Sequence, residues 1–218
     1  MQYHYHLQGF IYSLLKGSKY HYVHNKEGYK FFCFSNIFPA KDLEIGDLRT
    51  LMVSSPDNEF LSYVYDVLQK WNAKVKIKYM KFGIEYVQKL NVNIPTCPFT
   101  LITGTPITIR IPREKYKAHG IEPRGYYDYV YWRSDHPISL FISQIENNLV
   151  RKYSEYFEFN NDRSLIEDNN NFPHLLQQYK FKKQISTRVY MKGLDQIIIA
   201  TLWEFEFNTF PNKDMIQV

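Results

Sequence analysis

The sequence has few of the residues on which disulfide-stabilised and metal-binding proteins depend. Its 218 residues include only two cysteines, Cys33 and Cys97, each within an apolar, strand-like run. Neither cysteine has a CxxC partner or a nearby pair of histidines, and this excludes a disulfide framework and a zinc site. A DxD-type motif or a His/Asp cluster is also lacking, so the residues indicate no metal or cofactor site. The cysteine usage predicts a reducing compartment.

Long apolar runs are lacking as well. No stretch approaches the roughly 18 consecutive apolar residues of a membrane helix. The first residues also lack the charged, apolar and small segments of a signal peptide, so we expect a cytoplasmic protein without a membrane partner. What is present is a hydrophobic fraction of 44%, enough for a folded core, and a net charge of +5. That charge is a modest bias toward polyanions such as nucleic acid.

Hydrophobic periodicity predicts two helices and a hairpin at the start of the chain. Apolar residues recur at helical spacing over residues 5–16, and again over residues 56–71, where Ser55 is the expected cap and Pro56 the first turn. Short apolar runs at residues 31–34 and 51–53 are typical of two strands that pair as a hairpin.

Strict alternation in residues 74–79 (KVKIKY) predicts a strand. Val75, Ile77 and Tyr79 should face a core, and three lysines should share the opposite face. A basic free face suits RNA phosphates, although a solvated lysine face is equally ordinary. Basic residues recur in the last part of the chain, so the candidate RNA-binding residues are Lys74, Lys76, Lys78, Lys180, Lys182 and Arg188.

Two prolines within residues 91–98 (NVNIPTCP) predict a domain boundary. The second unit is predicted to contain strands at residues 99–111 and 124–133, a helix from Pro137 to about residue 156, and strands at 179–192 and 196–208.

The order of these elements predicts an α+β fold. Both halves contain pieces of the βαββαβ arrangement, so we expect two tandem ferredoxin-like (RRM-like) domains, residues 1–95 and 96–218. Such a fold hosts many functions and does not choose among them.

The segment from Tyr12 to Lys30 contains the groups that metal-free RNA cleavage requires. In that reaction the ribose 2′-hydroxyl attacks its own phosphate, so a base, an acid and a cation are needed. His21 and His24 suit proton transfer near neutrality, Lys30 supplies a cation, and Tyr12 can orient a group or donate a proton. The same residue types are common on protein surfaces, and their spacing alone does not separate the two interpretations.

The segments HLQGFIYSLL, YVH and KFFCFS, in this order, resemble the N-terminal signature of the sixth numbered family of CRISPR-associated proteins, the repeat-specific endoribonucleases of the RAMP superfamily. The likeness continues through TPITIR, ISLFISQIENNLVRKYSEYF and the final strands. By position, the family's catalytic tyrosine, histidine and lysine fall on Tyr12, His24 and Lys30. His21 and Lys26 are the alternatives.

The resemblance implies an N-terminal domain that carries the catalytic set and a C-terminal domain that binds RNA. It also implies that CRISPR repeat RNA (pre-crRNA) is cleaved without a metal to a 2′,3′-cyclic phosphate and a 5′-hydroxyl. The rival interpretation is a non-catalytic RAMP-type subunit that holds guide RNA beside other subunits of a CRISPR effector complex. A third interpretation is a generic protein that binds single-stranded RNA. The sequence does not decide whether the protein forms a homodimer.

The resemblance further implies a missing segment at each end of the chain. A ferredoxin-like unit starts with a strand, yet Met1 stands only a few residues before the first predicted helix. The family also ends in a glycine-rich segment, which we expect to begin where this sequence stops at Val218. The 9 glycines of the sequence contain no substitute for that segment.

Overall fold

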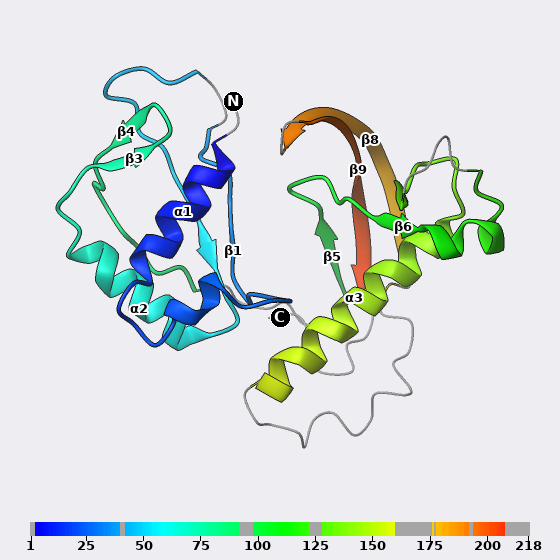
Figure 1. Ribbon diagram of the computed structural model, residues 1–218, viewed down its shortest axis with the longest axis horizontal. Helices are drawn as coiled ribbons and strands as arrows, with labels where there is room; N and C mark the ends of the chain where they lie inside the picture. The colour runs from blue at the N-terminus through cyan, green and yellow to red at the C-terminus, as the bar shows by residue number, and fades with distance from the viewer. Residues whose placement is uncertain are drawn as a thin grey trace. The chain divides into compact units, whose positions relative to one another are not determined.

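The computed structural model describes residues 3–39, 42–91, 98–122, 128–159, 176, 178–191 and 194–207. The chain forms two compact units, the first within Met1–Asn93 and the second within Ile94–Ile216 (Figure 1). The predicted boundary between residues 95 and 96 falls outside the described residues and stays a prediction.

The described residues of the first unit form two α-helices, a 3-10 helix and two antiparallel strand pairs. In chain order these are α1 (His4–Leu14), η1 (His21–His24), β1 (Cys33–Phe34), β2 (Val53–Ser54), α2 (Asn58–Gln69), β3 (Val75–Ile77) and β4 (Met80–Phe82). β1 pairs with β2, and β3 with β4. The helix expected over residues 5–16 and the pairing of the runs at 31–34 and 51–53 are confirmed.

Helix α1 supplies buried residues to both apolar clusters of the first unit. Its end packs with η1 and α2, where Leu14 and Val23 share one cluster with Phe60. Its start packs on the β3–β4 pair, where Leu7 shares a second cluster with Val75. Because Val23 belongs to η1 and is buried, the core itself fixes η1 next to α1.

The cap of α2 differs from the prediction. The helix begins at Asn58, and the Asp57 carboxylate accepts a hydrogen bond from the Phe60 N–H at 2.9 Å. The Ser55 hydroxyl instead donates to the Phe31 carbonyl at 2.6 Å and accepts from the Asp57 N–H at 3.1 Å. Ser55 therefore ties the segment before β1 to the segment before α2 and does not cap the helix.

The predicted strand over residues 74–79 is shorter than expected. Val75 and Ile77 are buried as predicted, but the strand ends there, and the chain turns at Lys78 and Tyr79 before it returns as β4. Tyr79 is 82% exposed, so its predicted place in the core is wrong. Lys78 has a φ of 56° and does not continue the alternation that placed it beside Lys76.

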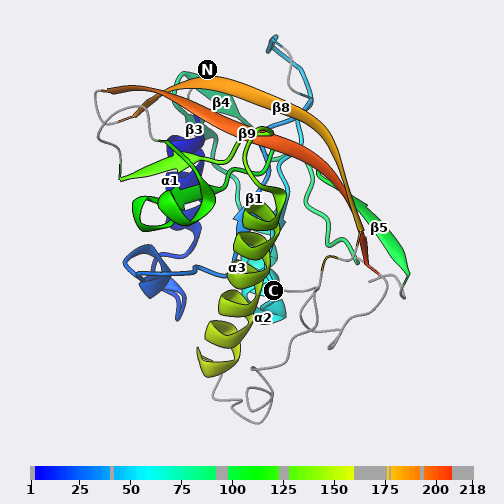
Figure 2. The same cartoon turned by 90° about the vertical axis from the view of Figure 1, so that its right-hand side faces the viewer.

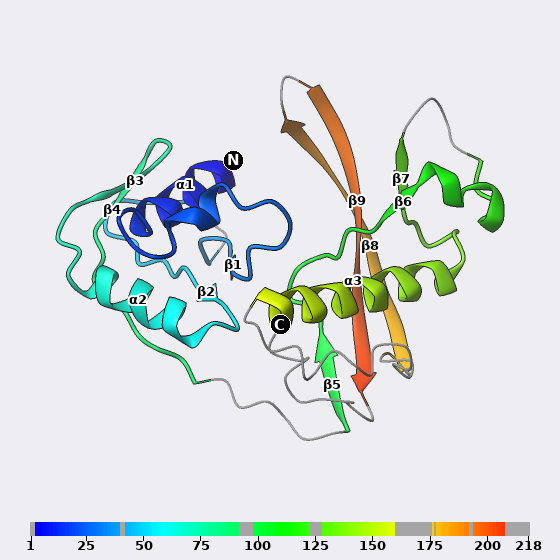
Figure 3. The same ribbon diagram turned by 60° about the horizontal axis from the view of Figure 1, so that its bottom comes forward.

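The second unit is built on a three-stranded antiparallel sheet in the order β5-β9-β8. Its elements are β5 (Phe99–Ile102), β6 (Arg110–Pro112), η2 (Arg113–Lys115), η3 (Lys117–His119), β7 (Tyr129–Tyr131), α3 (Ile138–Phe159), β8 (Gln178–Met191) and β9 (Leu194–Phe207). α3 runs across one face of the sheet (Figure 2 and Figure 3). Phe141 of α3 stacks there on Trp203 of β9. β6 and β7 form a separate antiparallel pair.

Most of the predicted elements of this unit are present. α3 and the two long strands are confirmed. The strand expected over residues 99–111 is wrong in its middle, because β5 ends at Ile102 and pairing resumes only through an isolated bridge at Ile107. Pro106 between them has no N–H to donate to a ladder. Of residues 124–133, Tyr129–Tyr131 form β7.

The mixture of helices and sheets confirms the α+β class. The two tandem ferredoxin-like domains stay a prediction, since the described strands of the first unit form two separate pairs. The expected missing segments also stay a prediction, because residues 1–2 and 208–218 are not among those described. In the part of the chain that the structure describes, no helix is long and apolar enough to cross a membrane.

We predict that Asp57→Ala lowers the free energy of unfolding by about 1 kcal/mol, because the Phe60 N–H loses its acceptor. Urea unfolding followed by circular dichroism measures this change. Asp57→Asn, which keeps an acceptor oxygen, should retain most of the stability. Equal stability of the alanine variant and the wild type would contradict the assignment of Asp57 as the cap.

Candidate active site

The three residues proposed from the sequence as catalytic lie together in the first unit. Tyr12 is half-buried on α1, His24 is exposed at the end of η1, and Lys30 is half-buried before β1. The rings of Tyr12 and His24 meet edge to face, with centroids 4.7 Å apart. The Lys30 ammonium lies 5.2 Å from the centre of the Tyr12 ring. The chain therefore gathers a phenol, an imidazole and an ammonium at one place.

The Lys30 side chain reaches this position by binding to the backbone of η1. Its Nζ donates to the carbonyls of Val23 and His24, each at 3.0 Å. The connection between them includes Gly28 at a φ of 78°, a left-handed conformation that glycine adopts without strain. An ammonium has three hydrogens, so one remains for another acceptor.

Two amide side chains orient the proton-carrying groups of the site. His24 Nδ1 lies 2.7 Å from Asn25 Oδ1, and since an amide oxygen only accepts, this contact favours the tautomer with the hydrogen on Nδ1. This leaves the Nε2 lone pair as the basic position of the ring. Gln8 donates from Nε2 to the Tyr12 hydroxyl oxygen at 3.1 Å, which leaves the hydroxyl hydrogen to be donated elsewhere.

Gln8 and Asn25 were missed in the sequence reasoning. The position of Gln8 four residues before Tyr12, on the same face of a helix, was an available signal. Asn25 follows His24 directly, but adjacency in the sequence does not predict the direction in which the Asn25 side-chain amide points.

The Tyr12 ring also packs against aromatic side chains of the core. Phe32 meets it edge to face at 6.0 Å between centroids, and Phe60 of α2 stacks on Phe32 at 5.4 Å. Tyr12 is thereby fixed against the core through Phe32 and Phe60.

The alternative residues occupy other positions. His21 is exposed at the start of η1. The Lys26 ammonium lies over the Phe31 ring, 4.3 Å from its centre. Tyr12 contacts His24 and Lys30, which are the first choices from the sequence. The catalytic role of these residues stays a prediction.

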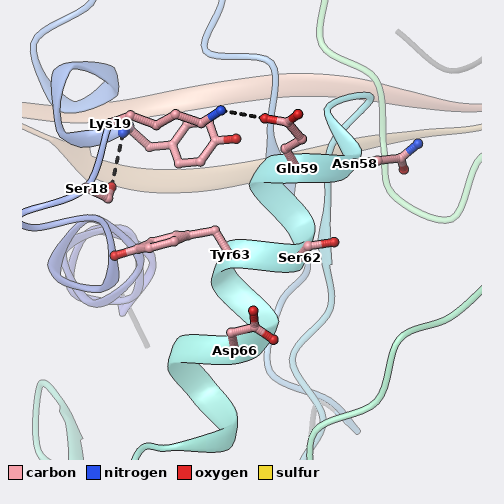
Figure 4. A pocket seen from close by; sticks show the side chains of 8 residues that line it. Ser18, Lys19, Asn58, Glu59, Ser62, Tyr63 and Asp66 are labelled. Atoms are coloured by element: carbon pink, nitrogen blue, oxygen red, sulfur yellow. Dashed lines mark hydrogen bonds and ion pairs between the residues drawn. The ribbon is translucent and has the colours of Figure 1, made fainter.

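A hollow of about 580 Å³ lies on the first unit between the start of α2 and the segment after α1 (Figure 4). At its edge Lys19 reaches Glu59 at 2.5 Å, and this hydrogen bond holds the pKa of the Glu59 carboxyl below its usual value. Tyr12, His24 and Lys30 do not line this hollow. Its charged pair is already neutralised, so we place the candidate site at the three residues and not here.

The predicted RNA-binding residues fall into two groups. In the first unit Lys74 and Lys76 are exposed, Lys78 lies in the turn, and Lys81 stands directly opposite Lys76 across the β3–β4 pair. Lys81 was missed because the sequence reasoning ended the strand at residue 79 and did not recognise the hairpin.

The second group lies on β8, where a bulge interrupts the register between Phe181 and Lys183. Lys182, at this bulge, forms an ion pair with Glu204, and the hydrogen bond between them holds the pKa of Glu204 below its usual value. Lys180 is also opposite Glu204 in the register, whereas Arg188 is exposed opposite Ile197. The charge of Lys182 is therefore offset within the protein.

No group of three or more histidine, cysteine, aspartate or glutamate side chains within the described residues is placed to hold a metal ion. Cys33 is exposed and has a free thiol. Cys97 lies outside the described residues.

Comparison with known sequences identifies relatives over most of the chain. The CRISPR-associated endoribonuclease Cas6 2 of Methanocaldococcus jannaschii is 28% identical over 199 residues, which are 91% of this chain and 75% of the relative. The CRISPR-associated endoribonuclease Cas6 of Haloferax mediterranei is 27% identical over 209 residues, 94% of this chain and 75% of the relative. No family model matches.

Solved structures share the fold. A structure described as CRISPR associated protein Cas6 superposes with a TM-score of 0.60 at 19% identity, covering 98% of this chain and 82% of the other. A second, described as a RAMP protein binding different RNA substrates, gives a TM-score of 0.63 at 17% identity with the same coverage. These relatives, which match along nearly the whole length of the chain, support its assignment to the Cas6 family of CRISPR-associated proteins.

Proposed function

We propose that this chain cleaves CRISPR repeat RNA in precursor transcripts without a metal ion, using Tyr12, His24 and Lys30. The observation that carries the proposal is the meeting of these three side chains, with 4.7 Å between the Tyr12 and His24 rings and 5.2 Å from Lys30 to the Tyr12 ring. The substrate is supported by the relatives, which are named CRISPR-associated endoribonucleases.

The proposed reaction is an internal transesterification. The His24 Nε2 takes the proton of the ribose 2′-hydroxyl, whose oxygen forms a bond to the adjacent phosphorus. The bond from phosphorus to the 5′-oxygen breaks, and the Tyr12 hydroxyl gives its proton to that oxygen. The products are a 2′,3′-cyclic phosphate and a 5′-hydroxyl.

The hydrogen bonds of the site suit these roles. The contact with Asn25 favours the hydrogen of His24 on Nδ1 and Nε2 as the base. Gln8 donates to the Tyr12 oxygen, and the hydroxyl hydrogen of Tyr12 stays available. Lys30 uses two hydrogens on backbone carbonyls, and the third can stabilise the charge of the phosphorane. Groups held in position in this way can supply a large part of the rate acceleration of an enzyme.

The rival function is a non-catalytic RAMP-type subunit that holds RNA together with other subunits of an effector complex. That function requires no convergence of the three side chains. Their proximity therefore favours the enzyme.

The same proposal includes two tandem ferredoxin-like domains, the first catalytic and the second RNA-binding, which the order of elements in the two units supports.

We predict that His24→Ala slows cleavage of a cognate repeat RNA at least about 100-fold, the lower range for general acid–base catalysis. RNA affinity should stay nearly unchanged, because the imidazole acts on the transition state. Single-turnover cleavage and equilibrium binding measure the two effects separately. His21→Ala is the matched control, and a larger loss in that variant, or full activity of His24→Ala, would exclude His24 from the mechanism.

We predict that cleavage continues in excess chelator, since the side chains supply acid, base and cation. The end groups of the products, mapped by mass spectrometry, should be a 2′,3′-cyclic phosphate and a 5′-hydroxyl. Loss of cleavage in chelator would count against the metal-free reaction. A product that ends in a 3′-hydroxyl would count against it more strongly, because attack by the neighbouring 2′-hydroxyl cannot produce that end.

We predict that replacing Lys74, Lys76 and Lys78 by alanine weakens RNA binding and flattens its salt dependence, by about 0.7 in log–log slope for each lost contact with a single strand. Titrations at several salt concentrations give the slope. Lys182→Ala is the control, because Glu204 already neutralises that lysine, and its slope should change less. An unchanged slope in the triple variant would place the RNA elsewhere.

A further inference from the structure

The tip of the β3–β4 hairpin exposes a tyrosine. The last pair of the hairpin is Ile77 with Met80, so Lys78 and Tyr79 alone make the turn. Tyr79 is 82% exposed, whereas Val75 and Ile77 behind it are buried with Leu7 of α1. The apolar face of the hairpin is thus already occupied, and nothing in the packing of the core requires an aromatic ring at the tip.

The backbone of this turn is unfavourable for the residue that it contains. Lys78 has a φ of 56°, a left-handed conformation that a tight hairpin usually gives to glycine or asparagine. The Lys78 ammonium lies 5.2 Å from the centre of the Tyr79 ring. Strained backbone of this kind concentrates at binding sites.

The outer face of the hairpin carries uncompensated positive charge. Lys76 and Lys81 stand directly opposite each other and are both exposed, an arrangement in which like charges repel. Elsewhere Lys19 and Lys182 are paired with carboxylates. Within the described residues, no ion pair links the hairpin lysines to a carboxylate. A bound polyanion would remove the repulsion.

We propose that the hairpin tip is a docking site for an unpaired nucleotide of RNA, in which Tyr79 stacks on the base while Lys76 and Lys81 contact the flanking phosphates. An exposed aromatic ring among cations is the composition with which proteins bind single strands. A base within a duplex has both faces covered by its neighbours, so the ring selects RNA that is single-stranded at this point. The docking site at Tyr79 rests on the proposed function in one respect only, which is that the ligand is RNA.

The test measures the affinity of the full chain for a short oligouridylate and for an RNA duplex of equal length, by fluorescence anisotropy. Tyr79→Ala should weaken binding of the single strand about 10-fold, in the range for loss of one stacked base, with no change in salt slope. Tyr79→Phe should bind as the wild type does, because the ring is kept. Lys81→Ala should instead lower the slope by about 0.7.

Tyr86→Ala is the matched control, since Tyr86 is 73% exposed in the same unit and its hydroxyl donates to Gln88. Its affinity should not change, and duplex binding should be equal in all the tyrosine variants. Wild-type affinity of Tyr79→Ala, an equal loss in Tyr79→Phe, or an equal loss for the duplex would overturn the docking site. Thermal melts of each variant confirm folding.

Cleavage of repeat RNA by the wild-type chain separates this proposal from the proposed function. If the wild type cuts and Tyr79→Ala binds oligouridylate normally, only the docking site is wrong. If the wild type does not cut and Tyr79→Ala still loses affinity, the docking site stands and the nuclease proposal fails.

Discussion

The site of the first unit depends on the two hydrogen bonds from the Lys30 ammonium to the carbonyls of Val23 and His24. These bonds join Lys30, which lies just before β1, back to η1, so the segment between them forms a closed loop. Because Val23 is buried in the cluster that contains Leu14 of α1, the closed segment is also fixed on α1, where Tyr12 lies. Without this link, the Lys30 side chain would lose its fixed position beside Tyr12 and His24, which the packing of η1 on α1 already brings together.

The sequence was sufficient to predict elements whose periodicity is sustained. α1, α2 and α3 each repeat their apolar residues often enough to show which face is buried, and the two long strands are sustained runs of strand-forming residues. The sequence was insufficient where a few residues decide whether a strand continues or the chain turns. KVKIKY alternates up to Tyr79, yet the chain turns after Ile77, because Met80 and Phe82 return to fill the same apolar cluster. That pairing is a tertiary contact that alternation does not report.

The catalytic candidates were accessible to sequence reasoning because they lie within residues 12–30, so a short connection can bring them together. The partners that orient them were less accessible. The direction of the Asn25 amide, the bulge at Lys182 and its ion pair with Glu204 all depend on side-chain geometry that composition does not contain. The charge of Lys182 illustrates the consequence, since in the sequence it resembles the hairpin lysines and in the structure it is compensated.

The most direct measurement of the central claim is a structure of this chain bound to its repeat RNA with a 2′-deoxy substitution at the nucleotide before the scissile bond. The scissile phosphate is expected within hydrogen-bonding distance of Lys30 Nζ, with His24 Nε2 facing the ribose C2′ and the Tyr12 hydroxyl facing the 5′-oxygen. A scissile phosphate bound at a surface that contains none of these three residues would contradict the account.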